Sequence, residues 1–384
     1  MTVLLSVFIA LLGIGVIIPI LPLFATDLGA SGIGLSMIIA AFSISRSLLQ
    51  PVVGSWSDRF GRKKFLITGL VVYGLVGLLI PTAKSVLHLI LIRAIHGIGS
   101  AMIVPIAMAY MGSLSPPGME GCYMSRLNIA IFCGIGCGPV VGGILSDIWG
   151  LPTVFHVMTL LSFGAALLVV RYMPSISPGE LENRGQRGLL SSLVLMMRRQ
   201  RTRGLLIARF GTMVMMVPTM ALLPLLMARW PETSGLQVGI VIAGRTLTNA
   251  LLQTPFGKLA DRGNKIQLLT LGSLAMACAI VSIPLAKTFS TILIIYMFLG
   301  ASEAVVWPVL GALATEEGRS HFGQGTMMGV FSLAMSCGVF SGAVMSGFGM
   351  DFLGIPWAFR LAGVVVPFFA LYGGRQIWLA DRHG

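Results

Sequence analysis

Charged residues are scarce in this sequence. They make up 10% of its 384 residues, whereas 56% of the residues are hydrophobic. An average soluble domain carries about 25% charged residues. A chain this poor in charge lacks the polar surface of a soluble domain, so the composition excludes that class and indicates an integral membrane protein.

Acidic residues and cysteines are rarer still. The chain has 13 Asp and Glu against 26 Lys and Arg, which gives a formal net charge of +13. Because the cations stand in short stretches between apolar runs and no nucleic-acid-binding motif is present, we do not expect nucleic acid as a partner. The 5 cysteines lie in or beside apolar runs, without metal-type spacing. They are expected to be free thiols, and no metal or other cofactor is expected.

Long apolar runs are what the sequence has in abundance. About 20 apolar residues span a bilayer, and runs bounded by Gly, Pro and charged residues predict an all-α membrane protein of twelve transmembrane helices. The longest polar stretch predicts an N-terminal six-helix bundle over 1–171, a linker over 172–203 with one amphipathic segment near 189–197, and a C-terminal six-helix bundle over 204–384. The twelve ranges are 2–24, 35–56, 65–83, 87–111, 122–146, 152–171, 204–228, 236–257, 266–286, 290–314, 324–349 and 355–378.

Lys and Arg predict the orientation. If both termini and the linker share one side of the membrane, that side holds 18 Lys and Arg outside the helices and the opposite side holds 3. The positive-inside rule makes the first side cytoplasmic. We therefore expect a multi-pass protein of the inner or plasma membrane, surrounded by lipid, with both termini in the cytoplasm.

The sequence contains an internal repeat. The stretch Gly54-Ser-Trp-Ser-Asp-Arg-Phe-Gly-Arg-Lys-Lys64, predicted as a loop after the second helix, returns in a weaker form over 257–265, 203 residues later. Residues 48–50 match 251–253 at the same offset, and 147–155 match 351–359 at 204. Matches at offsets of 203 and 204 along the chain indicate one helical unit present twice in the same orientation. Parallel halves of this kind usually bind substrate at their interface, near the middle of the membrane.

Four stretches of the sequence fit known motifs. The loop fits G-x-x-x-D-R-x-G-R-K/R, and Leu12, Gly13, Pro19 and Pro22 fit L-G-x5-P-x2-P. Residues 93–97 fit R-x-x-x-G, and residues 134–143 fit G-x3-G-P-x2-G-G. In these motifs the sequence resembles the major facilitator superfamily, in particular its twelve-helix drug–proton antiporters. The resemblance covers the whole chain. It implies the major facilitator fold of two pseudo-symmetric bundles and transport of a small molecule in exchange for protons.

The resemblance implies that the loop latches the cytoplasmic ends of the two halves. A carboxylate at a helix end accepts hydrogen bonds from a neighbouring helix N-terminus, which suits Asp58. For Lys63 and Lys64 we favour a role in topology alone. The latch residues predicted are Gly54, Asp58, Arg59, Gly61 and Arg62.

Small residues predict close packing of the fifth helix. Gly134, Gly138 and Gly142 recur every fourth residue, so one face lets a neighbouring helix approach closely. Pro139 removes a backbone donor and can bend the helix. The pattern fits either a tight contact between the halves or ordinary helix packing.

Glu303 is the only acidic residue deep within a predicted helix. Burial disfavours the charged form of a carboxylate, so such a group can load and release a proton. The alternative is a permanent ion pair with an arginine. The resemblance implies a part in proton coupling for Arg93, whose alternative is a structural role. His96 is a further titratable candidate.

Arg46 and Arg245 lie near the middles of the second and eighth predicted helices. Cations at that depth suit a carboxylate or phosphate of the cargo, and the alternative is pairing with Glu303 or with backbone carbonyls. Asn249 occupies the repeat equivalent of Arg46. Other residues expected to line the same cavity are Asn128, Phe132 and Trp307.

Two transport hypotheses follow. The first is a monomeric, proton-coupled exporter of small amphipathic molecules. The second is an exporter of an anionic metabolite, siderophore or lipid-like compound, which the two arginines and the acid-free first helix favour. A membrane enzyme is not supported, because no Ser/His/Asp set, carboxylate pair or metal motif is present. A sensor built on a transporter fold would usually carry a long tail or an extra domain.

Overall fold

The computed structural model describes residues 2–17, 20–30, 32–174, 189–227, 229–230 and 235–383. These residues form helices joined by short turns and contain no strand. Pro19 and the middle of the predicted linker, residues 175–188, lie outside the described residues. The chain divides into two compact units. Unit 1 comprises 1–114, 126–189 and 318–332, and unit 2 comprises 115–125, 190–317 and 333–384.

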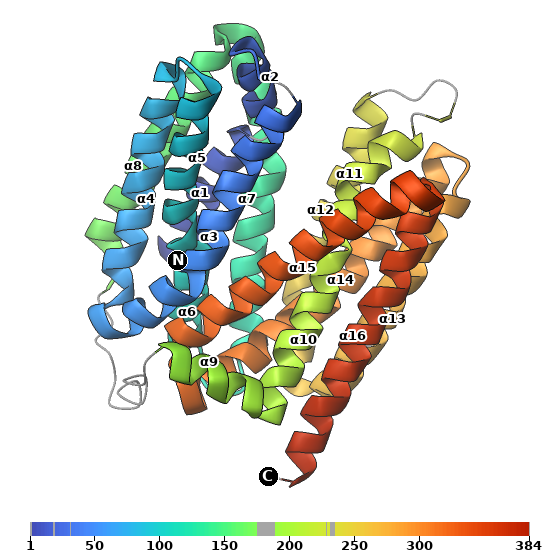
Figure 1. Ribbon diagram of the computed structural model, residues 1–384. Helices are drawn as coiled ribbons and strands as arrows, with labels where there is room; N and C mark the ends of the chain where they lie inside the picture. Colours follow the sequence, from blue (N-terminus) through green and yellow to red (C-terminus); the bar gives the residue numbers. More distant parts are fainter. Residues whose placement is uncertain are drawn as a thin grey trace. The chain divides into compact units, whose positions relative to one another are not determined.

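Within the described residues, the first half of the chain forms the helices α1 to α8 (Figure 1). The loop predicted from Gly54 to Lys64 is mostly helical, because helix formation continues past the end of the apolar run. Only Gly61, with φ of +93°, separates two of these helices, and this left-handed conformation favours glycine. The bounds are α1 Thr2–Ile17, α2 Ile20–Asp27, α3 Gly32–Phe60, α4 Arg62–Leu79, α5 Val86–Ala101, α6 Val104–Leu114, α7 Glu120–Trp149 and α8 Leu151–Tyr172, with a 3₁₀ turn η1 at Ile80–Thr82.

The described residues of the second half form the helices α9 to α16. They include α9 where the linker was predicted to be amphipathic. The second copy of the loop motif is again largely helical, since α12 continues to Arg262. The bounds are α9 Leu189–Arg198, α10 Gln200–Val214, α11 Met216–Met227, α12 Gly235–Arg262, α13 Lys265–Ser282, η3 Ile283–Leu285, α14 Phe289–Glu317, the π-helical η4 Gly318–Phe322, α15 Gln324–Leu353 and α16 Ile355–His383.

Ten segments of the described residues are helical, long and apolar enough to cross a membrane. The other two predicted spans coincide with α1 plus α2 and with α12. On α4, Leu66, Leu70 and Tyr73 are fully buried, while Leu75 and Leu78 on other faces are over 40% exposed. A helix that is apolar on every face is typical of a membrane span.

The predicted fourth helix, 87–111, is broken in the structure. Helix α5 ends at Ala101, and Met102 N donates to Gly99 O in a tighter turn before α6 begins at Val104. Pro105 follows at once and has no N–H to donate back to Ala101, so the regular pattern cannot continue through it. Its repeat equivalent, Pro308, lies inside the continuous α14.

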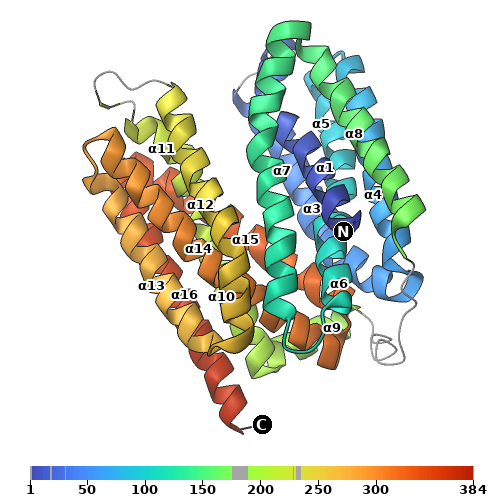
Figure 2. The same cartoon turned by 180° about the vertical axis from the view of Figure 1, so that it is seen from behind.

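The two units repeat the same internal packing. In unit 1, α3 packs on α5, while α8 packs on both α1 and α4. In unit 2, α12 packs on α14, while α16 packs on both α10 and α13. Figures 1 and 2 show α13 beside α16 from both sides. The repeat detected in the sequence is therefore also present in the helix pairing of each unit.

Candidate functional site

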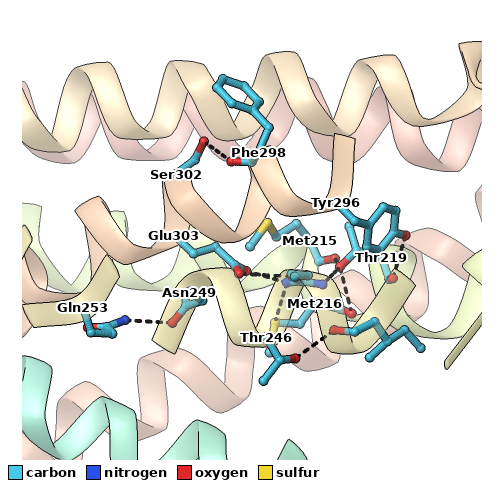
Figure 3. Close-up of polar contacts among 12 residues, drawn as sticks. Met215, Met216, Thr219, Thr246, Asn249, Gln253, Tyr296, Phe298, Ser302 and Glu303 are labelled. Atoms are coloured by element: carbon cyan, nitrogen blue, oxygen red, sulfur yellow. Dashed lines mark hydrogen bonds and ion pairs between the residues drawn. The ribbon is translucent and has the colours of Figure 1, made fainter. Parts of the chain in front are cut away.

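A buried ion pair lies inside unit 2, between α12 and α14. The Glu303 carboxylate accepts hydrogen bonds from Arg245 Nε at 3.1 Å and from Arg245 Nη2; the dashed lines reaching Glu303 in Figure 3 mark this pair. Both side chains are 2% exposed. Water does not screen charges at this depth, so the attraction is strong and so is the penalty for leaving either partner alone. The ion pair that the sequence left as an alternative for Glu303 is present.

Helix α11 completes the surroundings of Arg245. Arg245 Nη1 donates to Thr219 Oγ1 at 2.8 Å, and Nη2 lies 3.5 Å from Met216 Sδ. The Tyr296 hydroxyl donates to the Thr219 carbonyl at 2.8 Å (Figure 3). The guanidinium is therefore held on several sides. Sequence reasoning missed Thr219 and Tyr296, because single hydroxyl residues in apolar helices carry no distinguishing pattern.

Gly300 explains how the two helices come close enough for this pair. A Cβ atom at Gly300 would lie 2.2 Å from the Arg245 carbonyl oxygen, so no larger residue fits without moving α12. Glu303 follows one helical turn later, on the same helix face. The missing side chain at Gly300 thus brings Arg245 within reach of the carboxylate.

Arg93 and His96 contact each other within unit 1. Arg93 Nη1 lies 2.6 Å from His96 Nδ1, one turn further along α5, and the guanidinium lies over the Phe42 ring, 4.2 Å from its centroid. The His96 ring meets the Tyr73 ring edge-on at 4.5 Å. Since a guanidinium only donates hydrogen bonds, His96 Nδ1 is assigned as the acceptor. This arrangement favours the neutral imidazole, with its proton on Nε2.

The residues predicted to bind substrate are divided between the two units. Three belong to unit 1 and are half-buried, and three belong to unit 2 and are buried. Asn249 Oδ1 accepts a hydrogen bond from Gln253 Nε2 at 2.9 Å, so Arg245, Asn249 and Gln253 form a buried polar row along α12. A cavity common to all six stays a prediction. The two groups are Arg46, Asn128 and Phe132 in unit 1, and Arg245, Asn249 and Trp307 in unit 2.

Asp58, at the end of α3, binds the start of α15. Its carboxylate accepts from Gly325 N at 2.6 Å, from Thr326 N at 2.7 Å and from Thr326 Oγ1 at 3.0 Å. Arg62 Nη2 donates to the same carboxylate at 3.0 Å. The positive end of the α15 dipole and its unpaired N–H groups explain why an anion is stable there.

The other predicted latch residues differ in their surroundings. A Cβ at Gly54 would lie 2.2 Å from the Gly325 carbonyl oxygen, so glycine is required for this approach. Arg62 is buried and its Nη1 donates to Ser113 Oγ. Arg59 is exposed on α3. Gly61 provides the turn between α3 and α4.

Asp261 is the equivalent residue in unit 2. Its two carboxylate oxygens accept from Gly121 N at 2.6 Å and from Cys122 N at 2.9 Å, at the start of α7. A Cβ at Gly257 would lie 2.9 Å from the Gly121 carbonyl oxygen, so this glycine, like Gly54, faces a backbone carbonyl at the start of another helix. Although the motif around Asp261 is weaker in the sequence, its contacts with a helix N-terminus are of the same kind.

The glycines of α7 pack on α1 within unit 1. A Cβ at Gly138 would lie 2.3 Å from Gly15 Cα, and one at Gly142 would lie 2.4 Å from the Val16 carbonyl oxygen. Gly134 meets the Phe8 carbonyl in the same way. The Pro139 ring is half-buried in an unbroken helix. The structure thus places this motif in helix packing inside one unit.

Sequence reasoning missed the counterpart of this motif in α15. Gly338 and Gly342 stand 204 residues after Gly134 and Gly138. A Cβ at Gly338 would lie 2.2 Å from the Phe210 carbonyl oxygen, and one at Gly342 would lie 2.0 Å from the Val214 carbonyl oxygen. The repeat offset alone could have identified both residues. Within the described residues, no three His, Cys, Asp or Glu side chains group as metal ligands.

Known proteins of related sequence include a transporter and a multidrug resistance protein by name. The family model described as "Major Facilitator Superfamily" matches residues 3–231 and 205–379. An uncharacterised MFS-type transporter of Methanocaldococcus jannaschii is 29% identical over 361 residues, covering 94% of this chain and 93% of that protein. Multidrug resistance protein 2 of Bacillus subtilis is 26% identical over 366 residues, covering 94% and 90%.

A solved structure shares the fold. The human organic anion transporter MFSD10 superposes with a TM-score of 0.80 at 20% sequence identity, over 96% of this chain and 98% of that one. At this identity the likeness concerns the course of the backbone.

Proposed function

Because the chain belongs to the major facilitator superfamily, we propose that it is a proton-coupled antiporter that exports small amphipathic molecules by alternating access. The resemblance drawn from the sequence motifs is confirmed. The family and its transporter relatives indicate a transporter rather than an enzyme. In this proposal twelve membrane helices form two six-helix bundles over 1–171 and 204–384, with a linker over 172–203. The monomer lies in the inner or plasma membrane with both termini in the cytoplasm.

Export is the direction that the relatives favour. The Bacillus subtilis relative that aligns over most of this chain is named a multidrug resistance protein. Efflux of a small molecule against its gradient needs an energy source, and a carboxylate buried in the membrane is the means by which a proton gradient can supply it.

The observation that carries the coupling is the buried pair of Glu303 and Arg245. A deprotonated Glu303 holds the guanidinium through two hydrogen bonds. A proton on Glu303 removes the negative charge and frees Arg245 from the pair. Since the pair is 2% exposed on both sides, the two states differ by a large electrostatic term. Proton binding and the position of Arg245 are therefore linked.

This linkage fits antiport. In the proposal, the cargo binds while Glu303 is deprotonated and holds Arg245, and it leaves when a proton on Glu303 frees Arg245, so proton and substrate occupy the site in turn. Arg46, Asn128, Asn249, Phe132 and Trp307 complete the substrate site. Arg93 tunes the coupling, with His96 as the alternative proton carrier. The contacts of Asp58 with α15 and of Asp261 with α7 act as latches that are released in each cycle.

The experiment is transport by the purified protein in proteoliposomes. Glu303→Gln keeps the shape of the side chain and removes its titration. We expect it to abolish substrate accumulation driven by a pH gradient while substrate binding stays measurable and independent of pH. A mutant that still concentrates substrate after a pH step would exclude Glu303 as the proton carrier and bring His96 or Arg93 forward.

A second candidate is export of an anionic compound, and Arg93 favours it. Arg93 is 8% exposed, and its contacts are His96 and the Phe42 ring. No carboxylate of the described residues pairs with it. A buried cation without a counterion is costly, and an anionic substrate would supply one. MFSD10, the structural neighbour, is named an organic anion transporter.

Ligand stabilisation distinguishes the two candidates. Anionic and cationic amphipathic compounds are compared for the rise in melting temperature that they give the purified protein. Stabilisation by cations alone would support the first candidate. Stabilisation by anions that is lost in Arg93→Gln would support the second.

A further inference from the structure

A cavity of about 340 Å³ opens in unit 2 where α10 and α13 begin and α16 ends. It lies outside the substrate and coupling residues discussed above. Its walls combine cations with apolar side chains. The lining residues are Arg201, Gly263, Asn264, Lys265, Ile266, Leu313, Trp378, Asp381 and Arg382.

The depth of this cavity is that of the lipid headgroups. Three apolar spans end around it: Gln200–Met227 and Lys265–Leu285 start there, and Ile355–Arg382 finishes there. Trp378 is 39% exposed, and the Arg382 guanidinium lies 3.8 Å above its ring centroid. Trp and Arg at the end of a span are typical of the boundary between hydrocarbon and water. A phospholipid in the adjacent leaflet therefore presents its phosphate at this level.

One of the three cations, Arg201, is already paired with carboxylates. Arg201 binds Glu317 at 2.9 Å, Glu316 at 2.7 Å and Asp381 at 3.0 Å. All three of its guanidinium nitrogens thus face carboxylates. Arg201 fixes the ends of α10, α14 and α16 together and has little capacity left for a ligand.

The other two cations keep donors available. Lys265 Nζ lies 2.9 Å from Glu316 Oε1, and an ammonium group has three donors. Arg382 pairs with no carboxylate of the described residues, and its contact with Trp378 is made through the ring face. A guanidinium on an aromatic face still has N–H groups at its edge. Lys265 and Arg382 therefore leave unused donors at the same cavity.

We propose that this cavity binds the phosphate of an anionic phospholipid between Lys265 and Arg382. Ile266, Leu313 and Trp378 pack against the glycerol and the first methylenes, which a soluble phosphate does not have. The Asp381 carboxylate also lines the cavity and opposes the anion, so the occupied site depends on Arg201 holding Asp381. The site is independent of the proposed transport cycle.

The test measures phosphatidylglycerol binding to the full-length protein in neutral detergent, by native mass spectrometry with phosphatidylcholine as reference. Each cation near a membrane surface contributes a factor of about five, so Lys265→Gln with Arg382→Gln should weaken phosphatidylglycerol binding roughly 25-fold. The matched control is Lys287→Gln with Arg375→Gln, two exposed cations outside the cavity. It removes the same net charge and should leave the affinity within about two-fold of the unmodified protein.

Asp381→Asn is included because it should increase binding, and misfolding of a variant cannot explain an increase. It removes the opposing charge from the cavity wall, so phosphatidylglycerol should bind roughly five-fold more tightly. Equal affinities in the cavity and control variants would overturn the proposal. A second experiment adds inorganic phosphate as a competitor. If it displaces phosphatidylglycerol at equal concentration, the occupant is soluble phosphate bound by the same cations, and the proposal of a lipid is wrong.

Discussion

Replacing Glu303 and replacing Arg245 in the buried pair of unit 2 should lower the stability of the protein by unequal amounts. At 3.1 Å and an effective dielectric constant of about 20, the attraction between unit charges is about 5 kcal/mol. Removing one partner of a buried pair costs about 3–5 kcal/mol, because the other charge is left uncompensated. Glu303→Gln leaves a guanidinium that cannot lose its proton. Arg245→Met leaves a carboxylate that becomes neutral by taking one up.

We therefore expect Glu303→Gln to be the more damaging change to stability. Its free energy of unfolding at pH 5 should fall by about 3–4 kcal/mol, whereas Arg245→Met should lose about 1–2 kcal/mol less than that, because near pH 5 a carboxylate takes up a proton at small cost. The double variant removes both charges and should recover most of the loss.

Reversible denaturation in mixed micelles, followed by tryptophan fluorescence between pH 5 and 8, measures all four proteins. The coupling free energy of the double-mutant cycle should be at least about 2 kcal/mol. Additive effects of the two single changes would refute the reasoning, because they would mean that the pair is solvated or already broken in the resting protein.

The remaining predictions concern the two latches, the guanidinium of Arg245 and the glycine contacts. Asp58→Asn replaces a carboxylate that accepts three bonds from the start of α15, so proteoliposome transport should fall at least ten-fold with insertion intact; unchanged rates at matched expression would contradict a latch. Asp261→Asn should lower transport comparably, since Asp261 binds two backbone N–H groups of α7, and a negligible effect would mean that only the first latch matters. Arg245→Lys keeps the charge but loses the bidentate fork, so substrate affinity by isothermal titration should fall several-fold; unchanged affinity would assign Arg245 to structure alone. Gly342→Leu should lower the melting temperature by several degrees because the Val214 carbonyl is in the way, and Gly347→Leu, where a Cβ meets nothing within 4 Å, is the control that should not.

Contacts are best predicted from the sequence where the residues that make them stand close together in the chain. The motif around Asp58 joins a helix end, a carboxylate and two required glycines within a few residues, and the structure gives each a distinct contact. Apolar runs likewise located the helices. They misplaced helix ends, because a polar residue such as Asp58 leaves the apolar run while remaining in the helix.

Other parts of the site depend on contacts between segments far apart in the chain. Thr219 and Glu303 meet Arg245 from two other helices, and Arg201 meets Glu317 across 116 residues. Single polar residues of this kind carry no local pattern. The contacts of Asp261 carry no local pattern for a related reason: its partners are backbone N–H groups, which any sequence supplies.

The contact of Asp58 with α15 also sets an order of events during synthesis. Gly325 follows Asp58 by 267 residues, so the ribosome needs roughly 15 to 50 seconds to add the partner after the carboxylate has been made. In that interval the first helices enter the membrane with Asp58 at a helix end, where water can still reach it. Only a chain that has been extended past residue 326 offers the N–H groups of α15. A nascent chain stalled before residue 325 should therefore leave Asp58 open to carboxylate-modifying reagents, and release of the full chain should protect it.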